Sequence, residues 1–500
     1  MPDGAAGRDA EAGREEGELR TERDFIGEMS LPSGALYGIA AARARDNFAL
    51  SYGPVNPRLI RAMVTVKKAA ALTLARFGER EGGENAAAAD AVAAPGEAVK
   101  FRAVAEACDR VLSAAGEDGG GRDGGAGGRR GETGDAFFGA AFIVDALQGG
   151  AGTSINMNVN EVLANLALAI MGKKPGDYRI VHPLEDVNRF QSTNDVYPTA
   201  LRIAAILLLR ELSRGCAELQ ESLQKRETEF AAVKKLGRTE LMDAVPVSLG
   251  DEFGAWAQAI ARDRWRLYKM EERLRQINLG GQAVGHSEKA GRKFRFAVIE
   301  ELRLLTGIGL AAAEHPMDIT QNNDVFVEVS GLLKALAVNI MKISGDLRLM
   351  NSGPLGGLGE IRLAPLQAGS TIMPGKVNPV ICEMAMQAAM KVIANDGAVT
   401  MAASRGEFEL NAFLPLIADS LLESLSLLER TVFIIRTRCV ELLEADQARC
   451  AALLENSLAF AYGYAGKIGY AEVERIIAQA GGDGGKIRAA LEEAAGNPRR

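Results

Sequence analysis

The chain has 500 residues, which is more than one hydrophobic core usually serves, so two or three domains are expected. Its 58 lysine and arginine residues are outnumbered by 65 aspartate and glutamate residues, which gives a net charge of −7. This acidic balance argues against a nucleic-acid partner, because phosphate backbones are bound by basic surfaces. The aliphatic run that ends at Leu209 is far shorter than the ~20 residues that span a bilayer, which argues against a membrane partner.

The N-terminal sequence and the cysteine pattern indicate the cellular compartment in which the protein is expected to reside. The opening residues, MPDGAAGRDAEAGREEGE, are polar and acidic and lack the apolar core of a signal peptide. The five cysteines are odd in number, scattered and never spaced as CxxC. We therefore expect a reducing, cytoplasmic location and no zinc site. The three histidines are too isolated in the sequence to indicate another metal site.

The first part of the chain combines polar segments with helical patterns. Residues 1–22 are predicted to be a disordered tail, because they contain little that folding would bury. An N-terminal domain is expected over 23–192, with helices from Pro57 to Phe77 and from Ala98 to Ala114. Within it, the Gly-rich segment 116–134 is typical of a flexible, solvated insertion.

The middle of the chain is dominated by long amphipathic runs whose apolar residues recur by threes and fours. These runs lie at 201–223, 253–277, 329–347 and 420–443. A period near seven residues favours helices that cross at shallow angles, as in a bundle. The predicted fold is therefore all-α, with a helical bundle over 193–445 and a small helical C-terminal domain over 446–500. Helices this long and apolar are consistent with an oligomer that shares a helical core.

One short segment concentrates polar groups between glycines and prolines. Gly369–Pro379 reads GSTIMPGKVNP, and such a segment continues neither a helix nor a strand. A loop that carries Ser370, Lys376 and Asn378 is suited to bind and deprotonate a small anion. An ordinary solvated connection is the alternative. A phosphate-binding P-loop is excluded, because five residues separate the glycines where four are required and Val377 occupies the position of the metal-binding hydroxyl.

Three further polar clusters lie where helices are expected to begin or end. They are GGAGTSINMN at 149–158, QSTND at 191–195 and GRTELMD at 237–243. Each taken alone is an ordinary helix cap. Taken together, small hydroxyl and amide side chains at helix N-termini favour carboxylates, because backbone N–H groups and the helix dipole attract anions. With Lys376 and Asn378 added, the set suits a small substrate that carries two carboxylates.

The four segments, in this order, resemble the signature segments of the aspartase/fumarase superfamily, and 369–379 is similar to its GSSxMPxKxNP motif. The similarity extends from about Phe25 to the C-terminal helices. The strings QGGAGTS, MVTVKKAAA, QSTNDVYPT and KVIANDGAVTMAA are more similar to aspartate ammonia-lyases than to class II fumarases. The strings HPLEDVN at 182–188 and GEFELN at 406–411 retain similarity to the fumarases.

The resemblance implies a carbon–nitrogen lyase that converts L-aspartate to fumarate and ammonia by anti-elimination through an aci-carboxylate, without a cofactor. It implies that Ser370, on a mobile loop, is the general base. It implies that the substrate β-carboxylate is bound by Thr153, Ser192, Thr193 and Thr371. It implies that the α-carboxylate is bound by Thr239, Lys376 and Asn378, and that Asn194 contacts the departing amino group. It also implies a homotetramer whose sites are each assembled from three subunits. The alternatives are a fumarase that acts on malate and a catalytically impaired structural homologue.

The sequence departs from the family pattern at three places. Glu240 occupies a position where the family commonly has His or Gln; its carboxylate would pair with a substrate ammonium but repel the substrate carboxylates unless Lys376 compensates. Leu355 replaces a common Arg of a Ser-Gly-Pro-Arg run. Residues 281–294 match the usual GxTAxGTGxN pattern poorly. These departures leave the substrate less determined than the type of reaction.

Overall fold

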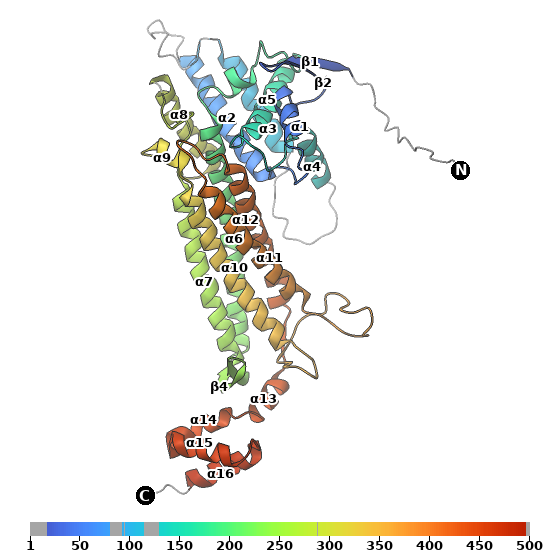
Figure 1. The fold of residues 1–500 in the computed structure, drawn as a ribbon, viewed down its shortest axis with the longest axis vertical. Coiled ribbons are helices and arrows are strands. Elements are labelled where there is room, and N and C mark those ends of the chain that lie inside the picture. Colours follow the sequence, from blue (N-terminus) through green and yellow to red (C-terminus); the bar gives the residue numbers. More distant parts are fainter. Residues whose placement is uncertain (1–17, 81–92, 95, 115–129, 288, 497–500) are drawn as a thin grey trace, which may run out of the picture. The chain divides into compact units, whose positions relative to one another are not determined.

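The computed structural model describes residues 18–80, 93, 94, 96–114, 130–287 and 289–496 (Figure 1). The chain divides into two compact units. The first unit falls within 1–204, 275–323 and 402–419, and the second within 205–274, 324–401 and 420–500. The division into three domains expected from the sequence stays a prediction.

The first unit is built on packed helices. They are α1 (Ile39–Asn47), α2 (Pro57–Arg80), α3 (Ala98–Ala114), α4 (Arg130–Ala141), α5 (Thr153–Ile170), α8 (Lys289–Thr306) and α9 (Pro316–Gln321), with a π-helical turn η2 (Pro183–Val187). Helix α2 packs against α3 and α8, and α3 packs against α5 (Figure 1). The two helices predicted in this part are therefore confirmed, and α2 continues to Arg80.

The disordered tail predicted over residues 1–22 overlaps a strand in the structure. Strands β1 (Leu19–Arg23) and β2 (Glu28–Pro32) form an antiparallel hairpin. The prediction of disorder is wrong for residues 19–22, because Glu22 is buried and its carboxylate accepts hydrogen bonds from Arg20 Nε at 2.9 Å and from the backbone N–H of Ile39 at 2.8 Å. Satisfied hydrogen bonds of a buried carboxylate offset the cost of ordering this segment. Residues 1–17 lie outside the described residues.

The Gly-rich insertion predicted over 116–134 is shorter at its C-terminal end. Its residues 116–129 lie outside the described residues, whereas residues 130–134 belong to α4. Arginine, glutamate and threonine in RGET have ordinary helix propensities, and the apolar residues that follow continue the same helix. The boundary of the insertion therefore lies before Arg130.

The long helices of the bundle are α6 (Thr193–Glu229), α7 (Leu249–Leu274), α10 (Asp324–Met350), α11 (Val380–Ala403) and α12 (Leu414–Ile435), followed by a π-helical turn η3 (Arg436–Val440). Four of them, α6, α7, α10 and α12, confirm the helices predicted from the amphipathic runs, although α6 begins earlier, at Thr193. Helix α7 ends at Leu274, before the strand Gln276–Ile277, and α12 ends at Ile435, so these two runs were predicted to extend too far as α-helix. In the second unit α7 packs against α10. Side-chain contacts join others, since Arg210 of α6 pairs with Glu271 of α7 at 2.8 Å and Asn395 of α11 donates to Ser424 of α12 at 3.1 Å. The stripe Leu333, Leu336, Ile340, Ile343 and Leu347 of α10 is buried, as expected of core residues.

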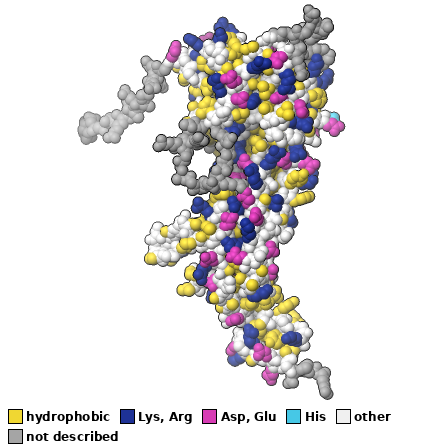
Figure 2. Space-filling model, turned by 180° about the vertical axis from the view of Figure 1, so that it is seen from behind, with side chains coloured by type: hydrophobic (Ala, Val, Ile, Leu, Met, Phe, Trp, Pro, Cys, Tyr) yellow, Lys and Arg dark blue, Asp and Glu magenta, His cyan; other side chains and the backbone are white. Residues whose placement is uncertain are grey.

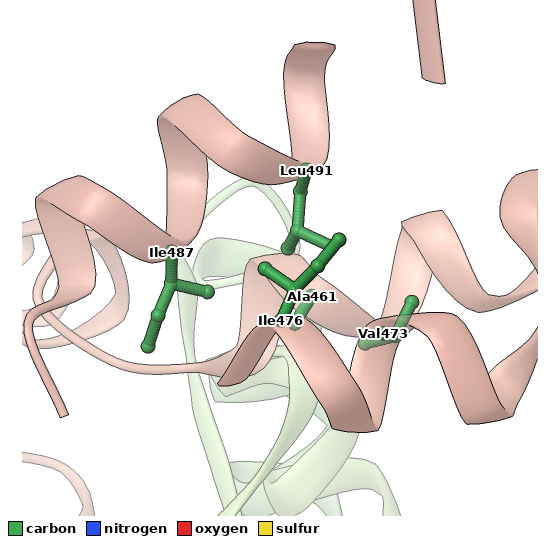
Figure 3. Packing of buried hydrophobic residues seen from close by; sticks show 5 residues of the cluster. All are labelled: Ala461, Val473, Ile476, Ile487 and Leu491. Carbon is green, nitrogen blue, oxygen red and sulfur yellow. The ribbon is translucent and has the colours of Figure 1, made fainter. Parts of the chain in front are cut away.

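The C-terminal helices have a small core of their own (Figure 3). They are α13 (Gln447–Glu455), η4 (Ala459–Ala461), α14 (Tyr462–Ile468), α15 (Tyr470–Gln479) and α16 (Gly484–Gly496). Ala461, Val473, Ile476, Ile487 and Leu491 pack together with η4, α14, α15 and α16 around them, whereas α13 packs against β3 (Lys234–Thr239). The predicted helical nature of residues 446–500 is confirmed for the part up to 496 that the structure describes.

Strands make a minor contribution to the described residues, so the all-α class is confirmed. Besides β1–β2 there are three two-stranded pairs. They are β3 (Lys234–Thr239) with β4 (Met242–Ser248), β5 (Gln276–Ile277) with β6 (Ala311–Ala312), and β7 (Ile361–Arg362) with β8 (Glu444–Ala445). On the face in Figure 2, basic and acidic side chains are interspersed. Among the described helices none is both long enough and apolar enough to cross a membrane.

Candidate functional site

Thr153 is the first residue of α5 and follows a tight turn. Gly150, Ala151 and Gly152 have φ values of 79°, 57° and 92°, and a Cβ atom at Gly152 would overlap the ring of Tyr197. Glycine is therefore required there by both the backbone and the space. The predicted helix start is confirmed. Thr153 is exposed, and its Oγ donates a hydrogen bond to Gly150 O at 2.7 Å.

Ser192 and Asp195 cap the N-terminus of α6. Ser192 Oγ accepts from the N–H of Asn194 at 3.2 Å, and Asp195 accepts from the N–H of Ser192 at 2.9 Å. Asp195 also accepts from Gly280 N at 3.0 Å and Gln282 N at 2.8 Å. Burial raises the pKa of Asp195 to about 7, although its backbone hydrogen bonds act in the opposite direction. Through Gln282, Asp195 thus joins residues 281–294, the segment that matches the family pattern poorly, to the start of α6.

Asn194 is held by the same segment. Pro198 has no N–H to donate to Asn194 O within the helix, and Asn278 Nδ2 donates to that oxygen instead, at 3.0 Å. Asn194 Nδ2 donates to Ala283 O at 2.8 Å. Among the described residues no group donates to Asn194 Oδ1, so this oxygen is suited to accept from a ligand N–H group.

Thr193 is joined to a buried network that the sequence analysis missed. Its Oγ accepts from Asn156 Nδ2 at 3.0 Å, and Asn156 in turn donates to Asn188 Oδ1 at 3.3 Å. Lys67 Nζ donates to the same Asn188 oxygen at 2.7 Å. The signal that would have revealed Lys67 is its place on the buried stripe of α2, four residues after Met63. A charged residue at such a position is rarely buried without a specific partner.

Thr239 and Glu240 lie at a hairpin turn, so the expectation of a helix end at 237–243 is wrong. Thr239 pairs with Met242 across β3 and β4, which leaves Glu240 and Leu241 as a two-residue turn with φ values of 53° and 66°. Such turns normally use Asn-Gly or Asp-Gly, and residues with larger side chains cost roughly 1–2 kcal/mol each in this conformation. Thr239 and Glu240 are exposed on this strained turn.

A buried ionic cluster holds the base of this hairpin. Glu360, which is fully buried, pairs with Arg238 at 2.8 Å and with Lys235 at 3.0 Å. Lys235 also pairs with Glu252 at 2.8 Å. Burial raises the pKa of Glu252, and Lys235 opposes that rise. The cluster therefore links Arg238, the neighbour of Thr239, to Glu360, which immediately precedes strand β7 (Ile361–Arg362).

Residues 369–379 form neither helix nor strand, as predicted. The oxygen of Ser370 accepts hydrogen bonds from the backbone N–H groups of Ile372 at 3.1 Å and Met373 at 2.9 Å. Two donors on one hydroxyl oxygen stabilise negative charge there. The two contacts fix the position of the Ser370 oxygen within the loop, as in turns closed by a serine side chain.

Asn378 and Lys376 close the base of the loop. Asn378 Nδ2 donates to Gly369 O at 2.7 Å, and Gly369 N donates to Lys376 O at 2.9 Å. The Lys376 side chain is exposed and makes no ion pair with the described residues. Its ammonium is thus available to an anion.

A pocket of 910 Å³ adjoins the end of the loop, within the second unit. Residues 375–379 line it, together with Arg348, Leu355 and Glu383. Arg348 lies 3.4 Å from Glu383, and Leu355 is 92% exposed. Leucine adds an apolar surface to the wall where the family commonly has a guanidinium.

The predicted site residues fall into two groups. Thr153, Ser192, Thr193 and Asn194 belong to the first unit, and Thr239, Glu240, Ser370, Thr371, Lys376 and Asn378 to the second. Thr371 is exposed in the loop. Among the described residues no three His, Cys, Asp or Glu side chains are grouped as metal ligands.

Comparisons with known proteins find similarity to lyases. A family model described as "Lyase" matches residues 135–394. An aspartate ammonia-lyase of Pseudomonas canavaninivorans is 40% identical over 92% of this chain and 89% of its own length. The Bacillus subtilis aspartate ammonia-lyase is 37% identical over 94% of this chain and 91% of its own.

Two solved structures are also similar. A Brucella melitensis protein described as fumarate lyase:delta crystallin is 40% identical, with a TM-score of 0.80 over 95% of this chain and 99% of that one. The class II fumarase of Schistosoma mansoni has a TM-score of 0.81 over 96% of this chain and 95% of its own, but is only 27% identical.

Proposed function

Because this chain belongs to the aspartase/fumarase superfamily of lyases, we propose that it converts L-aspartate to fumarate and ammonia. The chain is an aspartase-like carbon–nitrogen lyase. The observation that carries the choice of substrate is the 40% identity to an aspartate ammonia-lyase over 92% of the chain, against 27% to a fumarase.

Ser370 is the proposed general base. As an alkoxide, formed when its hydroxyl proton passes to water, Ser370 takes the C3 proton of L-aspartate, and the electron pair of that C–H bond moves into the β-carboxylate to form the aci-carboxylate. The electrons then return to form the C2–C3 double bond of fumarate, while the C2–N bond breaks and ammonia leaves. The N–H groups of Ile372 and Met373 support this role, because they stabilise the negative charge of the serine oxygen before it takes the proton.

The two carboxylates need different donors. We assign the β-carboxylate, where charge accumulates, to the hydroxyl groups of Thr153, Ser192, Thr193 and Thr371. Each preorganised donor of this kind is worth roughly 3–4 kcal/mol in other enzymes. We assign the α-carboxylate to Thr239, Lys376 and Asn378, and the exposed, unpaired ammonium of Lys376 in the described structure supports that assignment.

Asn194 and Glu240 are assigned to the amino group. Asn194 Oδ1 is suited to accept a hydrogen bond from an ammonium, since its Nδ2 is already committed to Ala283. The Glu240 carboxylate adds a negative charge on the strained hairpin turn. Both features favour a substrate with an ammonium over one with a hydroxyl group.

Replacement of Glu240 by glutamine tests this assignment. We expect kcat/KM for L-aspartate to fall roughly tenfold, as for a lost hydrogen bond to a charged group. The inhibition constant of succinate, which has no ammonium, should stay the same or improve because a like charge is removed. Asp243→Asn, on the same hairpin, is the matched control for charge. Equal weakening of both ligands would show that Glu240 does not recognise the amino group.

A fumarase is the second candidate, favoured by the TM-score of 0.81 to a class II fumarase. Fumarate absorbance is followed after L-aspartate or L-malate is added to purified protein. Fumarate from aspartate supports the proposal, and fumarate from malate alone supports the fumarase. Absence of fumarate from both would leave an impaired homologue.

We also propose a cytoplasmic homotetramer whose substrate sites combine residues of three subunits. Exposed apolar side chains on the second unit's helices support self-association: Trp265, Tyr268, Val338 and Met390 are 66%, 70%, 49% and 52% exposed. All five cysteines are buried free thiols, which suits a reducing compartment. Light scattering should give the mass of four chains, and a fully active monomer would contradict the shared sites.

A further inference from the structure

Lys67 is a buried amine whose hydrogen bond goes to an amide oxygen. Burial lowers the pKa of Lys67 to about 7, and attraction by the buried Asp195 carboxylate opposes that fall. Lys67 lies in α2 with a fully buried side chain, and its Nζ donates to Asn188 Oδ1 at 2.7 Å. Within the described parts of the chain it forms no ion pair with a carboxylate. Burying a charge in this way is unfavourable, so Lys67 must be explained by what it holds rather than by what it adds to stability.

Lys67 helps to orient the side-chain amides of Asn188, Asn156 and Asn160, which form one hydrogen-bonded network. Asn188 Oδ1 accepts from Lys67 Nζ, and Asn188 Nδ2 donates to Gln191 O at 3.1 Å, so Lys67 and Gln191 together hold the two ends of the Asn188 amide in one orientation. Asn156 and Asn160 each approach the same oxygen at 3.3 Å. An accepting oxygen requires a donor opposite it, so both side chains present their NH₂ groups to Asn188.

The orientation of the Asn156 amide determines whether the Thr193 hydroxyl acts as a donor or an acceptor toward a ligand. Asn156 Nδ2 also donates to Thr193 Oγ at 3.0 Å. No described residue accepts the Thr193 hydrogen, and Thr193 is 8% exposed. A hydroxyl whose oxygen accepts from an amide is left to donate its own hydrogen. A carboxylate is the ligand group that such a donor suits best.

We propose that Lys67 is a positioning residue that acts through Asn188 and Asn156 to make the Thr193 hydroxyl a fixed donor to a substrate carboxylate. This inference rests on the proposed function, since that function supplies the carboxylate. Lys67 itself does not touch the substrate.

A double-mutant cycle tests whether Lys67 acts through Thr193. Lys67→Met keeps an unbranched side chain, Thr193→Val removes the hydroxyl, and Thr193→Ser is the matched variant that keeps it. The dissociation constant of fumarate is measured by calorimetry, and KM by turnover of L-aspartate. Thr193→Val should weaken binding roughly 10- to 100-fold, as for a lost hydrogen bond to a charged group.

The proposal predicts that the effect of Lys67→Met depends on the hydroxyl. Lys67→Met should weaken fumarate binding about tenfold in the wild type and in Thr193→Ser, yet leave Thr193→Val unchanged within about twofold. Multiplicative effects of Lys67→Met and Thr193→Val would overturn the proposal. So would an unchanged dissociation constant in Lys67→Met alone.

Thermal unfolding separates positioning from a structural role. Burying the charged form of Lys67 is itself unfavourable, and Asn188 Oδ1 keeps Asn156 and Asn160 as donors without it. Lys67→Met should therefore bind fumarate less tightly with little change in Tm. If Lys67→Met does not fold, Asn156→Asp takes its place in the cycle. Its carboxylate accepts the Thr193 hydrogen and should reproduce the loss seen in Thr193→Val; full retention of binding would overturn the proposal.

Failure of the two proposals can be told apart. A wild type that forms fumarate from L-aspartate, combined with independent effects of Lys67 and Thr193, rejects only the positioning role. A wild type that neither turns over L-aspartate nor binds fumarate rejects the proposed function, and the positioning role with it.

Discussion

Replacing Ser370 with alanine is expected to lower kcat for L-aspartate by roughly 10²–10⁴-fold, the usual contribution of a general base. The variant lacks the oxygen that Ile372 and Met373 hold at 3.1 and 2.9 Å, so no group at that position can take the C3 proton. Ser370 lies in a loop and outside the buried core, so the Tm should be nearly unchanged. The measurement is steady-state formation of fumarate.

Binding distinguishes loss of the base from loss of loop order, because alanine also removes the two hydrogen bonds within the loop. The dissociation constant of fumarate should change by less than about threefold, well below the effect of a lost hydrogen bond to a charged group. Gln367→Ala, an exposed change shortly before the loop, is the control. A Ser370→Ala enzyme with normal kcat would refute the assignment of the base.

Replacing Lys376 with methionine is expected to lower kcat/KM by roughly 10²–10³-fold, as for the loss of a preorganised donor to a charged group. Lys376 is exposed and makes no ion pair with the described residues, so the change removes charge from the site without breaking a structural pair. The measurement is the initial rate of fumarate formation at low L-aspartate concentration.

A conservative variant and a surface variant define the origin of this effect. Lys376→Arg retains the charge but not the compact ammonium, so its kcat/KM should lie between those of the wild type and Lys376→Met. Lys173→Met removes an exposed lysine elsewhere and should have no effect. Equal activity of Lys376→Met and Lys173→Met would contradict a role in carboxylate binding.

The long helices were predictable because their cores repeat an apolar stripe over many turns. The start of α6 was not, since its stripe begins at Leu201 whereas the helix begins at Thr193. Pro198 lies between these positions, where a proline normally argues against a helix. Asn278, distant in sequence, replaces the missing donor at Asn194 O. Such a long-range compensation has no local signal.

The site was predictable only where its function is carried by a local motif. The loop at 369–379 could be located from glycines and prolines alone. The Glu240-Leu241 turn lacks the glycine that usually marks a two-residue hairpin, so a helix end was expected there. The partners of Lys67 come from separate segments, and only folding brings Asn188 to its ammonium.

The reverse reaction in D₂O tests the central claim, anti-elimination of ammonia from L-aspartate, most directly. Purified protein is incubated with fumarate and ammonium, and the product is identified by proton NMR. The account predicts L-aspartate with one deuterium at C3 in a single diastereomer, formed by addition of deuterium and nitrogen to opposite faces of the double bond. Malate, a mixture of the two C3 diastereomers, or no product would contradict it.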